Sequence, residues 1–412
     1  MSKVRPRLVG VAVAASVALL LGSVAQAETR VPAPDPSQGD GRTAAFYTWA
    51  NAIPEKPGEM LRTEALPPLL GLPDTGTQSR ILYTSTNGID GKTPVAVSGA
   101  FFTPKGTPPA GGWPLVAWAH GTVGLADICA PSWQTRSFRD LEYLGAWLRE
   151  GFAIVATDYQ GLGVPGPHPY LATRPEAYSV LDSIRAVRKA FPDIGSKVIV
   201  VGQSQGGGAA FATAAFAPEY APEIDIRGTV ATGIPFLTKE ALAHMPADPE
   251  KVRPTLAYTL YLALFAKQID PSLDLAALFT ERAMTVLDLA RNACVGAVFS
   301  DATAAELSDA TTFRKSPQAL LESLLPYIGY PTLKLPQPLF VGTGGADHDV
   351  PPSMQRRLVQ EACAAGTVVE AHVYPGLSHS QTVNASLRDS LPFVRRVLAG
   401  EAITPICDPK PQ

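Results

Sequence analysis

The chain has 412 residues, of which 46% are hydrophobic and 17% are charged. Disordered chains combine low hydrophobicity with high net charge, so this composition excludes disorder and predicts a large buried core. The formal net charge is −3 and no stretch is rich in Lys and Arg, which excludes nucleic-acid binding. The length suits one large domain with an insertion, or two domains.

The first 27 residues have the pattern of a secretory signal peptide. A start with three basic residues is followed by an apolar run over residues 8–24, which leads to small residues at Ala25 and Ala27. The alternative is a membrane anchor, but a run of about 17 residues is at the short limit for spanning a bilayer. We therefore predict cleavage after Ala27 and a secreted mature protein, extracellular or periplasmic.

The next residues predict an irregular arm and then a layered core. Residues 28–73 are rich in proline, and residues 80–86 and 94–102 read as two strands with Asn-Gly and Asp-Gly turn signals between them. Shorter, uniformly apolar runs are typical of strands buried on both faces of a parallel sheet, and they occupy residues 115–118, 152–156, 198–201 and 339–342. The clearest helix is residues 175–191, where apolar side chains recur every three to four positions. This alternation predicts an α/β fold with a mostly parallel sheet flanked by helices, formed by residues 74–234 and 337–412.

Residues 235–336 interrupt the alternation. They are rich in Leu and Ala, contain no convincing strand, and predict a helical insertion. Residues 254–266 are apolar nearly all round, which fits a helix buried within the insertion and also fits a lid over an apolar pocket. The two interpretations are compatible, because a lid must itself pack.

A candidate nucleophile lies at the end of the strand at residues 198–201. Gly202-Gln203-Ser204-Gln205-Gly206 is a G-x-S-x-G pattern between that strand and a helix of small residues. Such a turn places its serine hydroxyl above the sheet at a helix N-terminus, and the glycines avoid clashes with neighbouring backbone. The alternative, a phosphate-binding glycine loop, lacks the lysine that it requires. We predict Ser204 as the nucleophile.

A serine nucleophile needs a base and an acid, which in this fold class follow it in the order acid, then histidine. His379 lies on the predicted loop after a strand at residues 368–374, and we predict it as the base, whereas His372 lies mid-strand and is predicted to be structural. The loop after residues 339–343 carries two candidate acids, Asp347 and Asp349. We favour Asp347, four residues before Pro351, and expect Asp349 to cap the following helix.

Two backbone N–H groups are expected to form an oxyanion hole. One comes from Gln205, the residue after the nucleophile. The other comes from the loop after residues 115–118, where Thr122 is our first choice and Gly121 the alternative. His120, in the same loop, is predicted to brace it.

Four cysteines are spaced far apart, without the C-x-x-C pattern of a zinc site. An even number in an exported protein predicts two disulfides, and four cysteines allow three connectivities. Cys363 and Cys407 both belong to the C-terminal part, so we pair them, and this leaves Cys129 with Cys294. The alternative is buried free thiols. No metal and no cofactor is predicted.

Residues 202–207 resemble the nucleophile turn of the secretory lipase family of α/β-hydrolases, which contains fungal lipase A-type enzymes and bacterial relatives. The stretches at residues 127–132 and 157–171 support the resemblance, which covers the chain from about Trp49 onward. It implies an α/β-hydrolase fold with a helical lid, and it supports Ser204, Asp347 and His379 as a triad. The fungal lipases can carry an acidic residue where this chain has His120-Gly121.

The resemblance implies hydrolysis of acylglycerols or related carboxylic esters, in the manner of a triacylglycerol lipase. The expected partner is a small lipid or ester substrate, with transient contact to a lipid interface and no obligate protein partner. The alternatives of the same fold are a serine peptidase, an acyltransferase, a polyester hydrolase and a non-catalytic adhesion protein. We disfavour the peptidase because the insertion lacks a carboxylate cluster, and the adhesion protein because all three triad residues are present.

Overall fold

The structure is a computed structural model that describes residues 1–3, 28–243 and 249–410. The predicted signal peptide, residues 1–27, lies outside the described residues apart from its first three. In the part of the chain that is described, no helix combines the length and the apolar character needed to cross a bilayer.

Among the described residues, nine strands form one sheet in the order β1-β2-β3-β5-β4-β6-β7-β8-β9. The neighbouring pairs β1-β2, β2-β3 and β3-β5 are antiparallel. All neighbouring pairs from β5 to β9 are parallel. The bounds are β1 (Met60–Ala65), β2 (Thr75–Thr86), β3 (Pro94–Pro104), β4 (Trp113–Ala119), β5 (Ala153–Thr157), β6 (Ile194–Gln203), β7 (Asp225–Thr232), β8 (Leu339–Gly344) and β9 (Val369–Tyr374). The predicted mostly parallel sheet is confirmed.

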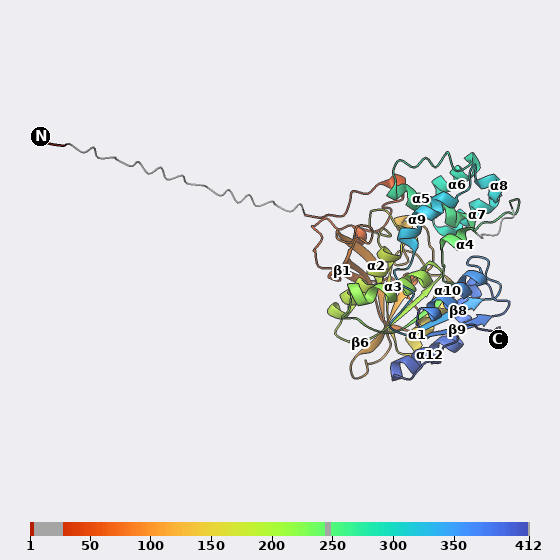
Figure 1. The fold of residues 1–412 in the computed structure, drawn as a ribbon. Helices are drawn as coiled ribbons and strands as arrows, with labels where there is room; N and C mark the ends of the chain where they lie inside the picture. The colour runs from red at the N-terminus through yellow and green to blue at the C-terminus, as the bar shows by residue number, and fades with distance from the viewer. Residues whose placement is uncertain (4–27, 244–248, 411–412) are drawn as a thin grey trace.

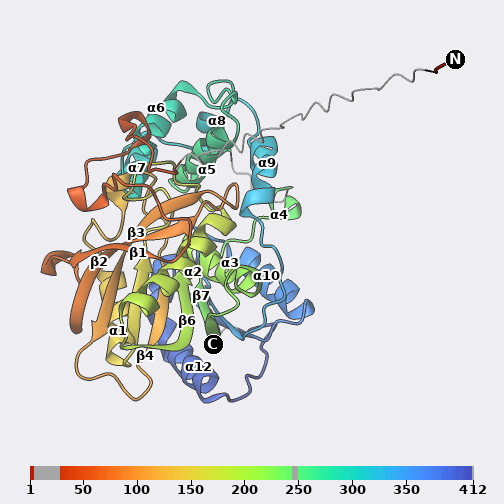
Figure 2. The same cartoon turned by 90° about the vertical axis from the view of Figure 1, so that its left-hand side faces the viewer.

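Helices cover both faces of this sheet (Figures 1 and 2). One face carries α1 (Phe138–Arg149), α11 (His379–Ala385) and α12 (Leu387–Ala399), which pack on the β4 side chains Val116 and Trp118. The other face carries α2 (Thr173–Ala190), α3 (Gln205–Tyr220) and α10 (Pro352–Ala364). Leu115 and Ala117 of β4 point to that second face. Alternate residues of β4 therefore pack into two separate cores. Because both faces of the strand are buried, its sequence is apolar throughout.

The N-terminal arm is more regular than predicted. Residues 28–73 contain strand β1 and three short 3₁₀ helices, η1 (Pro36–Gln38), η2 (Ala45–Tyr47) and η3 (Pro68–Leu70). The prediction of a wholly irregular arm is wrong because β1 lies at the sheet edge with no buried residue, and so lacks an apolar run. Strand β7 has no counterpart among the predicted strands, because two of its first three residues are charged and all three are exposed or half-buried.

The insertion is helical in its described residues, as expected. It contains α4 (Lys239–Ala243), α5 (Leu256–Ile269), α6 (Glu281–Ala290), α7 (Val295–Ala304), α8 (Asp309–Thr312) and α9 (Gln318–Ile328). Figures 1 and 2 show these helices gathered at one end of the molecule, outside the sheet. Nine of the fourteen residues of α5 are buried, in a core that the insertion helices build for themselves. The all-round apolar pattern of residues 254–266 therefore corresponds to a helix that is packed on most sides.

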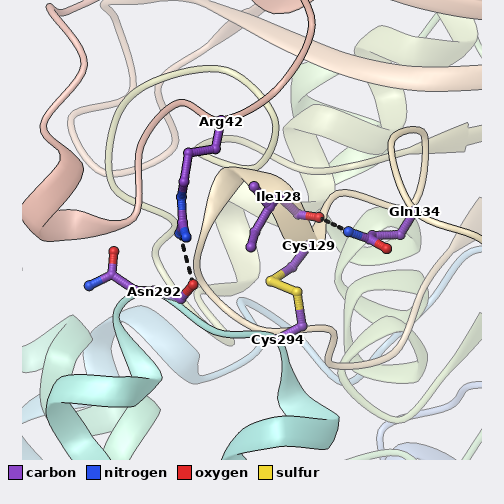
Figure 3. The surroundings of a disulfide bond; sticks show 6 residues. All are labelled: Arg42, Ile128, Cys129, Gln134, Asn292 and Cys294. Atoms are coloured by element: carbon purple, nitrogen blue, oxygen red, sulfur yellow. Dashed lines mark hydrogen bonds between the residues drawn. A yellow bond between two sulfur atoms is a disulfide. The ribbon is translucent and has the colours of Figure 1, made fainter.

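Two disulfides are present, and no described cysteine is free. Cys129 and Cys294 join the short helix η4 (Asp127–Cys129) of the core to the residue before α7, so this bond ties the insertion to the sheet domain (Figure 3). Cys363 and Cys407 join α10 to the C-terminal segment.

Hydrogen bonds reinforce the first of these links. Arg42 of the N-terminal arm donates to the carbonyl oxygen of Asn292, 2.8 Å away, and Gln134 donates to the carbonyl oxygen of Ile128 at 2.7 Å (Figure 3). The arm, the η4 loop and the insertion are thus held together at one place beside the sheet.

Candidate active site

Ser204 lies on a strained turn between β6 and α3. Its backbone has φ 58° and ψ −124°, a conformation that L side chains rarely adopt. A Cβ atom at Gly202 would lie 1.9 Å from the Gly206 carbonyl oxygen, and one at Gly206 would lie 1.9 Å from the Ala119 carbonyl oxygen. Only glycine fits at these two positions, which is the physical content of the G-x-S-x-G pattern.

The structure joins His379 to Asp347. His379 Nδ1 lies 2.7 Å from Asp347 Oδ2, and both side chains are buried. The other carboxylate oxygen accepts from the backbone N–H groups of Asp349 and Val350, each at 2.9 Å, and Gln355 Nε2 donates to Oδ2 at 3.0 Å. Asp347 is therefore held rigidly in the orientation that fixes the imidazole.

The prediction that His379 lies on the loop after β9 is wrong by one residue, because His379 is the first residue of helix α11. Ser378 is the N-cap of this helix and forms a capping box with Gln381, which fixes the backbone at His379. A Cβ atom at Gly233 would lie 2.5 Å from His379 Cε1, so a glycine at that position makes room for the ring.

The reactive faces of His379 and Ser204 share one cavity. His379 Nε2 is buried and has no hydrogen-bond partner among the described residues. No hydrogen bond joins Nε2 to the Ser204 hydroxyl in this structure, and such bonds often tighten only when substrate binds. With Nδ1 held by Asp347, Nε2 is the nitrogen left to accept a proton from a nucleophile.

Asp349 does not cap a helix. The N-cap of α10 is Pro351, which makes no side-chain capping bond, and Asp349 Oδ1 instead accepts from the Tyr258 hydroxyl at 2.9 Å. The expectation of a cap is wrong because Tyr258 of α5 contacts Asp349 in the loop after β8. The sequence around Asp349 gives no indication of this contact, since α5 lies far away along the chain. His372, on β9, lies 3.3 Å from Glu370 through its Nε2 atom, away from the Ser204 cavity lining.

The predicted oxyanion loop lies beside Ser204. Gly121 and Thr122 line the same cavity as Ser204, and a Cβ atom at Gly121 would lie 3.5 Å from Ser204 Cβ. The Thr122 hydroxyl lies 2.7 Å from that of Tyr170. His120 Nδ1 lies 2.7 Å from the Gly121 carbonyl oxygen, and burial lowers the pKa of its imidazole. His120 thus braces the loop as a neutral ring.

Gln205, the other predicted donor, is the first residue of α3, and the first N–H groups of a helix have no partner within it. The Gln205 side chain is held by two buried residues. Gln205 Nε2 lies 2.8 Å from Glu176 Oε1 and 3.1 Å from His168 Nε2. Burial raises the pKa of Glu176 to about 8 and lowers that of His168 to about 4. Sequence reasoning missed this cluster, since neither residue belongs to a motif.

Two cavities meet at Ser204. The first, about 520 Å³, contains His379 and is bordered by polar side chains of the segment before and within α1, and we call it the polar cavity. These side chains are Gln134, Thr135, Arg136, Ser137, Arg139 and Asp140.

The second cavity, about 770 Å³, lies between the insertion and the loop after β8, and we call it the apolar cavity. Aliphatic side chains are the largest group in its lining, with charged residues among them, and they include Leu237, Leu242, Leu256, Leu262, Leu321 and Met354. Both volumes are in the range of ligand sites.

Asp347, Asp349 and His379 are the one group of three metal-ligand side chains, within residues 28–243 and 249–410, whose donor atoms lie within 4.8 Å of one another. Asp347 already accepts from three N–H donors besides His379, and Asp349 from Tyr258. The four bonds to Asp347 occupy the lone pairs that a cation would need from it, so the arrangement fits a carboxylate–imidazole pair better than a metal site.

The fold and the Ser204 turn together define an α/β-hydrolase, and comparison with known proteins gives the family. The model of the secretory lipase family matches residues 137–388. The chain belongs to the secretory lipase family, which supports a carboxylic ester hydrolase.

Individual relatives agree with this assignment. The chain is 23% identical to Lipase A of Moesziomyces aphidis over 385 residues, covering 88% of this chain and 81% of that protein. It is 35% identical to Lipase 7 of Candida albicans over 122 residues, covering 27% of this chain and 28% of that protein. The crystal structure of Candida antarctica lipase A in its closed state shares the fold, with a TM-score of 0.70 at 20% identity over 92% of this chain and 89% of that chain.

Proposed function

We propose that this protein is a secreted serine hydrolase that cleaves acylglycerols or related carboxylic esters through an acyl-enzyme on Ser204. One observation carries the proposal: Ser204, on its strained turn, shares a cavity with His379, whose Nδ1 atom is bound by Asp347. This is the nucleophile, base and acid constellation of acyl transfer.

The chemistry follows from the geometry. His379 Nε2 accepts the Ser204 hydroxyl proton as Oγ attacks the ester carbonyl carbon, and Asp347 stabilises the resulting imidazolium. The oxyanion receives hydrogen bonds from the N–H of Gln205 and of Thr122 or Gly121. Collapse of this intermediate breaks the ester C–O bond, and the proton on Nε2 leaves with the alcohol. Water, deprotonated by His379, then releases the acid and restores Ser204.

The two cavities suggest how an ester is oriented. An acyl chain gains free energy by leaving water, so we place it in the apolar cavity, beneath the insertion helices. The leaving alcohol, which must accept a proton from His379, occupies the polar cavity. Residues 235–336 therefore act as a lid domain on a core formed by residues 74–234 and 337–412.

Secretion rests on two features. Residues 1–27 have the composition of a signal peptide, and the four cysteines form two disulfides, which persist in oxidising compartments. The intact mass of the exported protein should correspond to a chain that begins at Glu28. A mass that includes residues 1–27 would contradict cleavage.

Hydrolysis of p-nitrophenyl esters from acetate to octanoate tests the activity. Each methylene buried in the apolar cavity contributes about 0.8 kcal/mol, so kcat/KM should rise about fourfold per methylene over the first carbons. Long-chain glycerides should be cleaved and a peptide amide should not. Rates that fall steadily from acetate to octanoate would exclude an acyl site in the apolar cavity.

The matched variants are Ser204→Ala and Ser380→Ala, because Ser380 carries a hydroxyl on the same cavity. Ser204→Ala should remove turnover by on the order of 10⁴-fold and abolish covalent labelling by an organophosphonate. Ser380→Ala should keep both. Labelling that persists in Ser204→Ala would overturn the assignment of the nucleophile.

A further inference from the structure

The two cavities share very little of their lining. Ser204, Tyr258 and Asp349 are the three described residues that border both. Ser204 is where the ester carbonyl must bind, if the proposed function holds. Tyr258 and Asp349 therefore lie where the acyl and alcohol halves of a bound ester diverge.

Tyr258 is fixed from two sides. Its ring packs edge-on against Phe299 of α7, with the ring centroids 5.1 Å apart and the planes at 66°. Its hydroxyl donates to Asp349 Oδ1 at 2.9 Å. Burial, with Tyr170 and Asp349 nearby, raises the pKa of the Tyr258 hydroxyl, so it stays protonated and keeps donating.

Asp349 connects this pair to the catalytic residues. Its backbone N–H donates to Asp347 Oδ1 at 2.9 Å, so the Tyr258 acceptor and the acid that orients His379 belong to one hydrogen-bonded loop. The Tyr258 side chain is thus linked through Asp349 to the residue that orients His379.

We propose that Tyr258, held by Asp349, is the partition between the acyl and alcohol sites and determines specificity by excluding esters branched at the carbon next to the carbonyl. Because the carbonyl carbon must lie at Ser204, a substituent on the next carbon lies near the junction of the two cavities, which Tyr258 borders. A straight acyl chain has no substituent at this junction and continues into the apolar cavity. The inference rests on the proposed function and deepens it.

The test is a ratio of kcat/KM values, for p-nitrophenyl 2-methyloctanoate over p-nitrophenyl octanoate, measured on one preparation of each variant. Loss of active protein cancels in this ratio. Tyr258→Ala should raise the ratio on the order of tenfold, because one methyl group in a shaped site is worth 10-fold or more. Tyr258→Leu, a milder change within a helix, should raise it less, and it serves if the alanine variant folds poorly.

The hydrogen bond is tested separately. Asp349→Ala removes the acceptor and should raise the ratio severalfold, while Asp349→Asn keeps an acceptor oxygen and should leave the ratio within about twofold of the unaltered protein. Thr259→Ala is the positional control, since Thr259 follows Tyr258 on α5 but borders only the apolar cavity. It should not change the ratio.

An unchanged ratio in Tyr258→Ala and Tyr258→Leu, or an equal rise in Thr259→Ala, would overturn the partition. Hydrolysis of p-nitrophenyl acetate, which has no chain to sort, reports the proposed function independently. If the unaltered protein hydrolyses no ester in a Ser204-dependent manner, both proposals fall. If it hydrolyses acetate and the ratio does not respond, only the partition falls.

Discussion

Glu176 is the buried carboxyl group whose titration should leave the clearest mark on stability. It lies in the first turn of α2 with 1% of its surface exposed, and its Oε1 atom accepts from Gln205 Nε2. Burial raises its pKa from the usual 4.5 to about 8, an effect larger than the opposing effect of the Gln205 hydrogen bond. The folded protein therefore holds this proton more tightly than the unfolded chain.

The sign of the pH dependence follows. Below pH 4.5 Glu176 is neutral in both the folded and the unfolded state, so its titration does not lower the free energy of unfolding. As the pH rises from 4.5 to about 8, the unfolded chain releases the proton first, so the free energy of unfolding falls. The difference between these pKa values corresponds to about 5 kcal/mol above pH 8, because one pH unit is worth about 1.4 kcal/mol.

Glu176→Gln removes this titration while keeping a neutral side chain with an acceptor oxygen for Gln205. We expect the variant to match the unaltered protein near pH 5 and to be more stable by several kcal/mol near pH 8.5, measured by urea unfolding with the disulfides intact. Glu142→Gln, at an exposed position of α1, is the control. A Glu176→Gln effect that is the same at both pH values would refute a buried carboxyl with a raised pKa.

Three further changes test the site and its support. Asp347→Asn should lower kcat on the order of 10⁴-fold, because the amide favours the wrong tautomer of His379; a variant with near-normal kcat would contradict the assignment of the acid. Gly206→Ala should prevent folding or abolish activity, since its Cβ would lie 1.9 Å from a backbone oxygen; soluble, active protein would show that the turn can shift. Replacing Cys129 and Cys294 together by Ala should lower the free energy of unfolding by about 5 kcal/mol, as chain entropy predicts for a loop that spans a sequence separation of 165; an unchanged urea midpoint would refute this.

Local patterns were sufficient for the features that a short segment determines. The turn at Ser204 is specified by two glycines whose missing side chains make room for backbone oxygens of Gly206 and Ala119, so it is readable from five residues. Strands buried on both faces, such as β4 and β5, are apolar at every position except Thr157 at the end of β5, and this pattern predicts them from the sequence. Strands β1 and β7 carry polar or exposed residues, and their pairing depends on neighbours far away in the chain.

The sequence by itself determined the α/β-hydrolase class, the helical insertion, and the short set of residues from which a serine, a histidine and an acid could be drawn. Only the tertiary structure decided which aspartate contacts His379, since Asp347 and Asp349 are two residues apart on one loop and differ in what approaches them: the imidazole in one case, Tyr258 in the other. The same holds for Glu176, which meets Gln205 across two helices. Hydrogen bonds between distant segments leave no periodicity in the sequence, because each partner is a single residue whose spacing along the chain is set by the fold.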